Sequence, residues 1–270
     1  MKKPEKNNNK IENLVNTYKF LNNETTSYEV EKNEVLTVID IIDTDVESSF
    51  LRELIVNDNA TLNYIKIGKS DAKSSLKYTN TLGENATLNI SFFDFKNSFN
   101  SVETKLQNSD SSLNINGLID LQNNAKVEYD IQTNHQNKSL SDIKFKNLLN
   151  DKSSAKLNLF SIVEETAAFS KAFQNSQTIL LSDDSFIAVA PHLEILIDEL
   201  EASHGATCGD LDEDSIYYLE SRGIKEKDAK EILLNALRNE VYENLENEDL
   251  GNIVKGLVWV IKNTFPILKI

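Results

Sequence analysis

One short segment, residues 203–224, gathers side chains that could do chemistry. It reads SHGATCGDLDEDSIYYLESRGI and holds His204, the single cysteine Cys208 and a run of carboxylates. Imidazole and thiolate both bind zinc or iron, and the neighbouring glycines let the backbone bend. Two ligands do not fill a tetrahedral site, so a closed metal centre needs further carboxylates or residues of a partner. The segment therefore predicts at most a shared metal site, with His204 as its ligand.

The rest of the chain offers few other chemical candidates. His135 and His192 each stand alone among polar or apolar neighbours, and we expect both to be hydrogen-bonded structural residues. The sequence contains no glycine-rich phosphate loop, no paired-cysteine metal motif and no nucleophile elbow. These absences argue against a nucleotide-binding or hydrolytic site on this chain.

The charge of the chain limits its partners. With 28 basic and 43 acidic residues among 270, the formal net charge is -15. Such a balance opposes attraction to nucleic acid phosphates or anionic membranes, so neither is an expected partner. Residues 198–249 hold sixteen acidic and five basic residues. They form either solvated helix faces or a docking surface for a basic partner, and the sequence leaves both open.

The sequence shows no export signal, and we therefore expect the chain in the cytoplasm. One cysteine cannot form an internal disulfide, and the basic start lacks the apolar run of a signal peptide. The most apolar stretch, residues 253–270, is interrupted by Lys255 and Lys262 and broken by Pro266. We expect a C-terminal helix that docks on protein there, not a membrane span.

The middle of the chain reads as strands. From Tyr28 to about Leu200, short runs alternate apolar and polar residues, and a loose phrase such as ENATLNIS recurs. The apolar centres of this phrase lie 26, 25, 14 and 30 residues apart: Leu62, Leu88, Leu113, Val127 and Leu157. Spacings in the twenties suit the coils of a β-solenoid, although a sandwich of antiparallel strands also gives regular turn signals. The pattern favours the solenoid and leaves the sandwich open.

Both ends of the chain read as helical. Residues 1–28 form a lead-in that is partly disordered or holds one short helix, with apolar positions Ile11, Leu14, Val15, Tyr18 and Leu21. After residue 210 we expect a helix capped by Asp212 and ended by Gly223. A second helix follows from Ala229 to Leu245, and a third from about residue 250 to 264. The predicted domains are residues 1–28, a β core over 29–209 and helices over 210–270.

The residues of 203–224 also resemble a known family. SHGATCGDLDEDSIYYLESRGI is similar to the C-terminal signature of the SufB/SufD proteins of iron–sulfur cluster assembly, and it is most like the SufD branch. The upstream stretch NSQTILLSDDSFIAVAPHLEILIDELEASHGAT looks like the passage that leads into that signature. The resemblance covers about residues 130–245, and it fades before residue 100.

The resemblance implies a fold and a role. It implies a mainly β chain with α-helices: a right-handed parallel β-helix followed by a small C-terminal helical domain. It further implies a non-catalytic, SufD-like subunit of a SufBCD-type scaffold, with ATP hydrolysis on a SufC-like ABC ATPase. The β-helix edge would pair with a SufB-like subunit or, as a homodimer, with a second copy. No cofactor is expected on this chain alone, although the complex would hold a transient iron–sulfur cluster.

The resemblance also implies roles for single residues. His204 matches the histidine thought to lie near the subunit interface where the nascent cluster is held. Five residues would fix the first C-terminal helix against the end of the β-helix and shape the surface that docks the ATPase: Tyr217, Tyr218, Leu219, Arg222 and Gly223. Two departures matter: Ala202 stands where some members carry a cysteine, and the family's usual N-terminal helical region is much longer than residues 1–28, so we expect a short form of the family. Cys208 occupies a variable position, and we expect it to be a buried small side chain.

Two rival functions stay open at this point. One is a β-solenoid carbohydrate-active enzyme, and the other is an acidic adaptor with no role in cluster assembly. An acidic groove fit for sugar would favour the enzyme, whereas a smooth polar lateral face would count against it.

Overall fold

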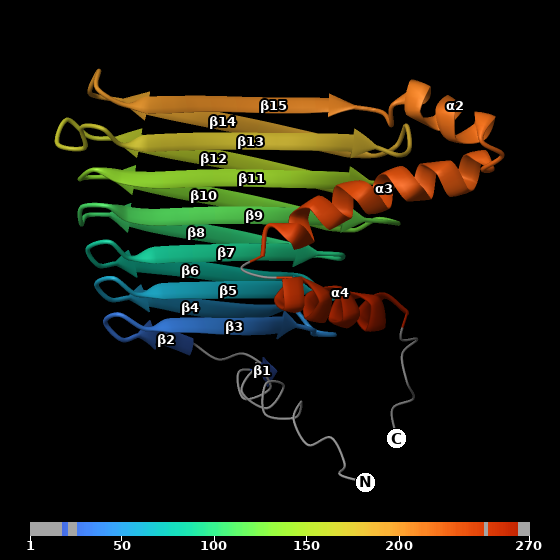
Figure 1. Cartoon of the computed structure of the whole chain (residues 1–270). Helices are drawn as coiled ribbons and strands as arrows, with labels where there is room; N and C mark the ends of the chain where they lie inside the picture. Colours follow the sequence, from blue (N-terminus) through green and yellow to red (C-terminus); the bar gives the residue numbers. More distant parts are fainter. Residues whose placement is uncertain (1–17, 21–25, 246–247, 264–270) are drawn as a thin grey trace, which may run out of the picture.

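A computed structural model describes residues 18–20, 26–245 and 248–263 of the chain. Strands dominate the described part (Figure 1). Their bounds are β1 Tyr18–Phe20, β2 Thr26–Val30, β3 Val35–Ile42, β4 Ser48–Val56, β5 Thr61–Gly68, β6 Ser74–Leu82, β7 Thr87–Asp94, β8 Ser98–Leu106, β9 Ser111–Leu121, β10 Lys126–His135, β11 Ser139–Leu149, β12 Ser154–Val163, β13 Lys171–Leu180, β14 Phe186–Ile195 and β15 Glu201–Gly209.

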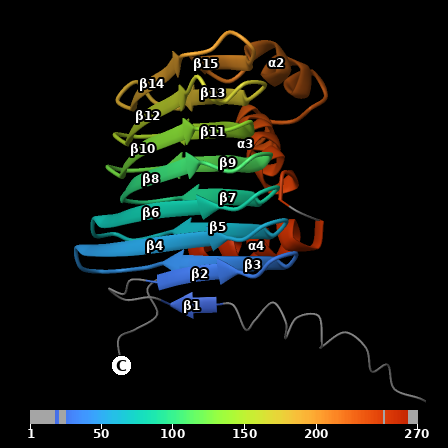
Figure 2. The same cartoon turned by 90° about the vertical axis from the view of Figure 1, so that its left-hand side faces the viewer.

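The strands form two parallel sheets that face each other. All odd-numbered strands, β1 to β15, form an 8-stranded sheet, and the even-numbered strands β2 to β14 form a 7-stranded sheet. Each coil thus lays one strand on each sheet before the chain rises to the next coil (Figure 2). The predicted β-solenoid is confirmed, and the antiparallel sandwich is wrong because every paired strand runs parallel.

The recurring sequence phrase marks successive coils of one sheet only as far as Leu113. Leu62 pairs with Leu88, and Leu88 pairs with Leu113, all in the odd-numbered sheet. Val127 and Leu157 lie instead on β10 and β12 in the even-numbered sheet, which explains why the spacing broke down there. Later coils are also longer, since Lys171 pairs with Glu201, 30 residues on.

Asparagine and aspartate shape the turns between strands. Asn33, Asn59, Asn85 and Asp110 have positive φ values between 53° and 63°. Short polar side chains tolerate this left-handed conformation better than other non-glycine residues. The backbone N–H of each donates to a carbonyl of the following coil, for example Asn59 to Glu84 at 2.8 Å. The turns therefore tie each coil to the next one.

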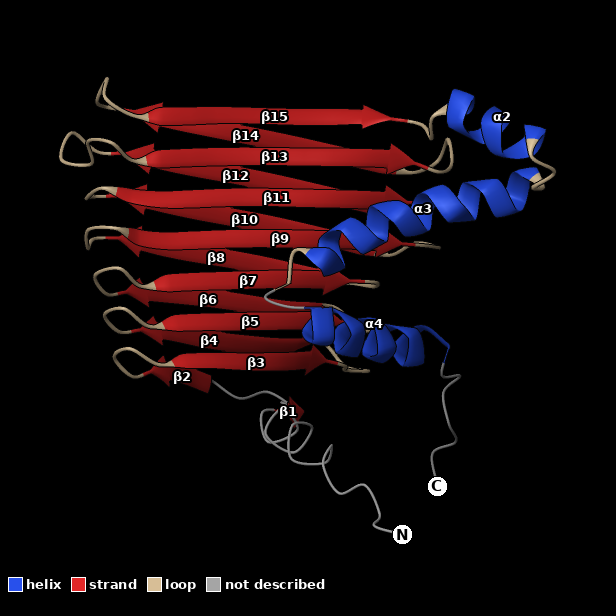
Figure 3. Cartoon of the chain, viewed as in Figure 1, coloured by secondary structure: helices blue, strands red, loops and turns tan. Residues whose placement is uncertain are grey.

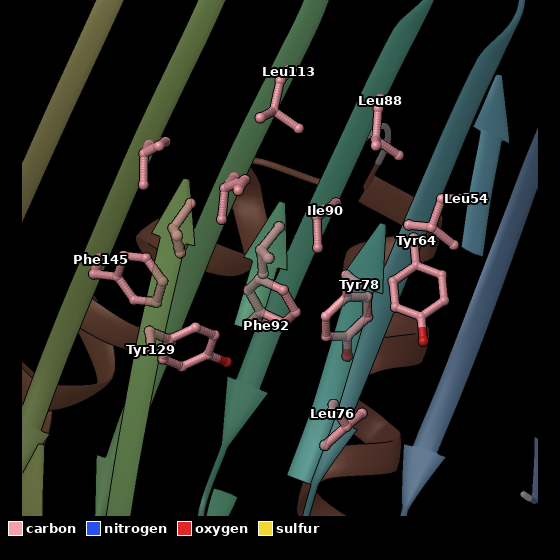
Figure 4. Close-up of a cluster of buried hydrophobic side chains, with 14 of the residues drawn as sticks. Leu54, Tyr64, Leu76, Tyr78, Leu88, Ile90, Phe92, Leu113, Tyr129 and Phe145 are labelled. Carbon is pink, nitrogen blue, oxygen red and sulfur yellow. The ribbon is translucent and has the colours of Figure 1, made fainter. Parts of the chain in front are cut away.

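Between the sheets lies a core with a row of aromatic rings. Tyr64, Tyr78, Phe92, Tyr129 and Phe145 lie one after another along the stack, with neighbouring ring centroids 4.9–5.8 Å apart (Figure 4). All five are 2% exposed or less. Tilted and edge-to-face pairs at such distances add to the stabilisation that burial provides.

Charged residues also lie inside this core. Arg52 donates to Asp40 at 2.7 Å, and both side chains have no exposed surface. Lys66 forms an ion pair with Asp94 and donates to the Ser98 hydroxyl at 2.8 Å. Since an unpaired buried charge is strongly unfavourable, each partner keeps the other in place.

Three described helices follow the solenoid: α2 Glu213–Ser221, α3 Glu226–Glu243 and α4 Glu248–Asn263 (Figure 3). The predicted cap is confirmed, because Asp212 accepts the backbone N–H of Ser215 at 3.0 Å. Gly223 follows the helix with a φ of +86°, as a left-handed helix end requires.

The longer helices pack against the outside of the odd-numbered sheet. Ile65, Phe93 and Leu118 of the sheet form one buried cluster with Tyr242 of α3 and Val254 of α4. The Phe93 and Tyr242 rings stack at 5.1 Å. None of the described helices is long and apolar enough to cross a membrane.

Only a small part of the predicted lead-in is described. Tyr18–Phe20 forms strand β1, which pairs with β3, so a helix through these three residues is wrong. The other apolar positions of that predicted helix, Ile11, Leu14, Val15 and Leu21, lie outside the described residues.

Candidate functional site

The last coil of the solenoid is an open end, which we define as strands β14 and β15. Each is the final strand of its sheet, so β15 pairs with β13 alone and β14 with β12 alone. In the strands before them, alternate residues are buried; in β15, every residue but Ala202 is exposed. Within the described part of the chain, no further coil covers this end.

His204 lies in the middle of the open end. It pairs in register with Gln174 of β13, a residue that is 2% exposed and points between the sheets. Because paired residues of parallel strands point to the same side, His204 also faces the interior side of the solenoid. It is exposed because no described part of the chain covers the last coil. Its imidazole is thus open to a molecule that docks on this end.

Cys208 is not the buried side chain that we expected. It is exposed on β15, since the last strand of a sheet has no neighbour on its outer edge. It lies four residues from His204 on one strand, which separates the two by about 13 Å. This distance excludes a single ion held by both side chains. In the described residues no group of three or more His, Cys, Asp or Glu could hold a metal.

The other two histidines differ, because only His135 shows the predicted hydrogen bonds of its ring among the described residues. His192 points outward from β14 and stacks on Phe160 at 4.7 Å. His135 is fully buried, and its ring nitrogens lie 2.8 Å from the hydroxyls of Ser139 and Ser141. Burial lowers the pKa of His135 to about 4, so the ring is neutral at physiological pH.

Apolar side chains surround the open end. The most exposed are Phe169 in the turn before β13 and Phe186 at the start of β14, at 68% and 61%. Ile195 and Leu196 follow at the end of β14. Phe169 has a φ of 63°, at a kind of turn position where other coils have Asn or Asp. An exposed aromatic ring on a strained backbone is a feature of recognition surfaces.

Helix α2 carries the predicted partner-binding residues at its surface. Tyr217 and Tyr218 are 74% and 58% exposed, and the Arg222 guanidinium lies over the Tyr218 ring at 5.3 Å. Leu219 is half-buried, and α2 as a whole has no buried residue. The two tyrosines therefore do not fix α2 against the solenoid. The hydrogen bonds that Ser215 donates lower the pKa of Asp212, which stays a charged cap.

The lateral face of the odd-numbered sheet bears on the carbohydrate-enzyme alternative. A hollow of about 360 Å³ lies there, beside Leu245 and Leu250. Its amides bond to one another: Asn114 donates to Asn89 at 2.9 Å, and Asn89 donates to Asn63 at 2.8 Å. Of its lining residues only Asp142 is a carboxylate. Hydrolysis of a glycosidic bond ordinarily needs two carboxylates, so this hollow does not favour the enzyme.

Sequence reasoning missed two residues next to the open end, Gln174 on β13 and Phe169 in the turn before it. Gln174 carries no local signal, because its partner Ser161 lies 13 residues away on the opposite sheet. Phe169 had a usable signal: an aromatic residue interrupts turns that elsewhere hold Asn or Asp.

Comparison with known proteins gives a consistent result. The family described as "SUF system FeS cluster assembly, SufBD core domain" matches residues 13–237, from before β1 into α3. The chain is 30% identical over 152 residues to "Iron-sulfur cluster assembly protein SufD" of Escherichia coli. It is 35% identical over 111 residues to a Plasmodium falciparum protein of the same name, and 43% identical over 56 residues to a SufBD family protein of Methanothermobacter thermautotrophicus.

These matches cover the relatives only in part. The alignments take in 56%, 41% and 21% of this chain, but 36%, 8% and 14% of the E. coli, Plasmodium and Methanothermobacter proteins. The chain thus spans about a third or less of the length of these relatives.

Proposed function

This chain belongs to the SufBD core-domain family of iron–sulfur cluster assembly proteins, and from that premise we propose that it is a SufD-like, non-catalytic scaffold subunit. In this role it pairs with another subunit through the open end and docks an ABC-type ATPase through its C-terminal helices. One observation carries the proposal: the last strand exposes His204 on an edge that no other described strand covers.

The open end suits strand pairing with a second subunit. The outer edge of β15 presents its backbone N–H and C=O groups, which a strand of another chain can bond. Phe169, Phe186 and Leu196 would add apolar contact around that ladder. The partner is a SufB-like subunit or a second copy of this chain.

Pairing at this end would complete a site for the cluster in transit. His204 supplies one ligand from the interior side of the last coil, and Cys208 is about 13 Å away along the strand. The remaining ligands of an iron site must then come from the partner's strand. The iron–sulfur cluster is in this role a transient cargo of the assembled subunits.

ATPase docking is proposed for the helical region. Tyr217 and Tyr218 are both exposed on α2, and the Arg222 guanidinium lies over the Tyr218 ring. Tyrosine and arginine are enriched at the centres of protein interfaces. ATP hydrolysis is assigned to the partner.

The cluster role is tested in the assembled complex. The chain is co-expressed with a SufB-like subunit and a SufC-like ATPase, and cluster formation is followed by absorbance after addition of iron and sulfide. We expect His204→Ala to lose most of the cluster while the subunits still co-purify. His192→Ala is the matched control, because this imidazole points outward and should leave assembly unchanged. Normal assembly by His204→Ala would refute the role of His204.

The docking role has its own test. The double variant Tyr217→Ser, Tyr218→Ser should release the ATPase in co-purification while keeping the SufB-like partner. Val46→Ser is the control, since Val46 is 63% exposed in the turn before β4 and far from α2 in the sequence. If the tyrosine variant retains the ATPase as well as the control does, α2 is not the docking surface.

A further inference from the structure

Gln174 is a buried amide that lies directly next to the proposed ligand His204. The two residues are paired in register on β13 and β15, and both face the interior side of the solenoid. Neighbouring strands are about 4.8 Å apart, so the two side chains lie within reach of each other. Gln174 is 2% exposed, whereas His204 is exposed at the open end.

Two contacts fix the orientation of the Gln174 amide. Its Nε2 donates to the Ser161 hydroxyl oxygen at 2.8 Å and to the backbone carbonyl of His192 at 3.2 Å. A carbonyl oxygen only accepts hydrogen bonds, so the NH₂ group must be the end that faces His192. The opposite end, Oε1, is buried and has no hydrogen-bond partner in the described part of the chain.

A buried acceptor of this kind calls for a donor. Buried polar atoms nearly always have a partner, so an orphaned one needs an explanation. Histidines that bind metals almost always donate their other ring N–H to a carboxylate, a carbonyl oxygen or water. Gln174 Oε1 is such an oxygen, and His204 is the neighbouring residue in register that carries a ring N–H.

We propose that Gln174 is a positioning residue for His204: the exposed His204 side chain rotates to donate one ring N–H to the unpartnered Oε1, and the other ring nitrogen then presents its lone pair at the open end. One tautomer of the imidazole is held in this way before any partner binds. The ligand of the second His204 ring nitrogen rests on the proposed function. The hydrogen bond between His204 and Gln174 Oε1 does not depend on that function.

The test measures the tautomer of His204 in the isolated full-length chain. Ring nitrogens are labelled with ¹⁵N, and their long-range couplings give the ratio of the two neutral forms. We expect one form to dominate in the parent. Gln174→Met keeps the length and removes the acceptor, and should change the ratio about three- to tenfold. Comparable amounts of both forms in the parent, or an unchanged ratio in the variant, would overturn the proposal.

Three further variants separate the hydrogen bond from packing. Gln174→Glu keeps an acceptor oxygen and should retain the parent tautomer. Gln177→Met makes the same change on the outward side of β13, where Gln177 accepts from Lys146, and should leave the ratio unchanged. Ser161→Ala removes a partner of Nε2 but leaves Oε1 in place, and should shift the ratio less than twofold. If Ser161→Ala shifts the tautomer ratio as much as Gln174→Met does, packing and not the hydrogen bond sets the His204 ring. That result would also overturn the proposal.

The cluster-assembly assay is read separately from the tautomer. If His204→Ala assembles clusters normally while the parent shows one tautomer, the proposed function fails and the positioning holds. If His204→Ala fails to assemble clusters while Gln174→Met leaves the tautomer unchanged, the positioning fails and the proposed function holds.

Discussion

The inner coils of the solenoid, β3 to β12, and its open end share one alternation of inward and outward residues, yet their inward side chains meet different surroundings. In β4, inward residues such as Phe50 and Leu54 are 3% exposed or less. In β15, the inward residues His204 and Cys208 are exposed. The difference comes from the presence or absence of the next coil and not from the strand itself.

We infer from this contrast that the inner coils provide stability and that the open end provides recognition. A coil that is covered on both sides can hold charges and aromatic rings because neighbouring coils supply ion-pair and ring partners. A coil that is covered on one side leaves backbone groups and side chains for another molecule. Four predictions test whether this division holds.

The largest effect should come from the buried ion pair of the inner coils. Asp94→Asn leaves the Lys66 ammonium without its counter-charge in a fully buried place. We expect the free energy of unfolding to fall by about 3–5 kcal/mol. Urea denaturation measures this loss. Asp71→Asn is the control, since its ion pair with Lys96 is largely exposed and its removal should leave the midpoint unchanged. Equal urea midpoints for Asp94→Asn and Asp71→Asn would mean that the ion pair of the inner coils stabilises the fold no more than the exposed one does.

His135 should give the inner coils a pH dependence. Because burial lowers its pKa to about 4 from 6.5, the folded state binds fewer protons than the unfolded state between these values. Stability should therefore fall as the pH drops through this window, by about 3 kcal/mol from this group. Urea melts of His135→Asn across the window should lack this part of the slope. His204→Asn, at the open end, should keep it; a parental slope in His135→Asn would refute the assignment.

Two glycines that point to opposite sides of the odd-numbered sheet test packing, Gly117 inward and Gly205 outward. A methyl group at Gly117 in β9 would lie 2.2 Å from the Phe145 ring, so Gly117→Ala should cost about 1–3 kcal/mol. At Gly205 in β15 the added methyl meets only Asn175 Oδ1 at 3.9 Å, and Gly205→Ala should be neutral or slightly stabilising. Thermal melts of the two variants give the comparison. Similar losses for both would mean that the contact with the Phe145 ring is not the cause of the loss in Gly117→Ala.

The smallest effect concerns Phe169 at the edge of the open end. Phe169→Asn places a residue that tolerates a left-handed turn at a φ of 63°. We expect the isolated chain to gain about 0.5–1 kcal/mol of stability and the paired subunits to bind more weakly. Denaturation and analytical ultracentrifugation separate the two readouts. Stronger pairing of the variant would mean that the aromatic ring has no part in recognition.

Much of the fold could be predicted because it repeats locally. The register of Leu62, Leu88 and Leu113 follows from their spacing, and the caps Asp212 and Gly223 follow from helix chemistry. The partial resemblance decided between solenoid and sandwich, which the alternation alone could not do. Val127 and Leu157 were misplaced because both sheets use the same alternation.

Features that depend on distant residues could not be predicted. The buried pair Lys66 and Asp94 is 28 residues apart, and charged residues are ordinarily read as surface residues. Cys208 was expected to be buried from its residue type, but strand order decides its exposure. His204 was singled out by its residue type and its spacing from Cys208, and the resemblance added the role at a subunit interface, whereas the orphaned oxygen of Gln174 appears only once the coils are stacked.

The stacking of coils also has a consequence for the order in which the protein folds and opens. Each coil contacts mainly the coils before and after it, for example β9 with β7 and β11, so folding can start within the inner stack and spread outward. The last strand to be added bonds to one neighbour only and should be the first to detach. Amide hydrogen exchange should therefore be slow in β9 and fast in β15, and it should slow in β15 alone when a partner strand binds there.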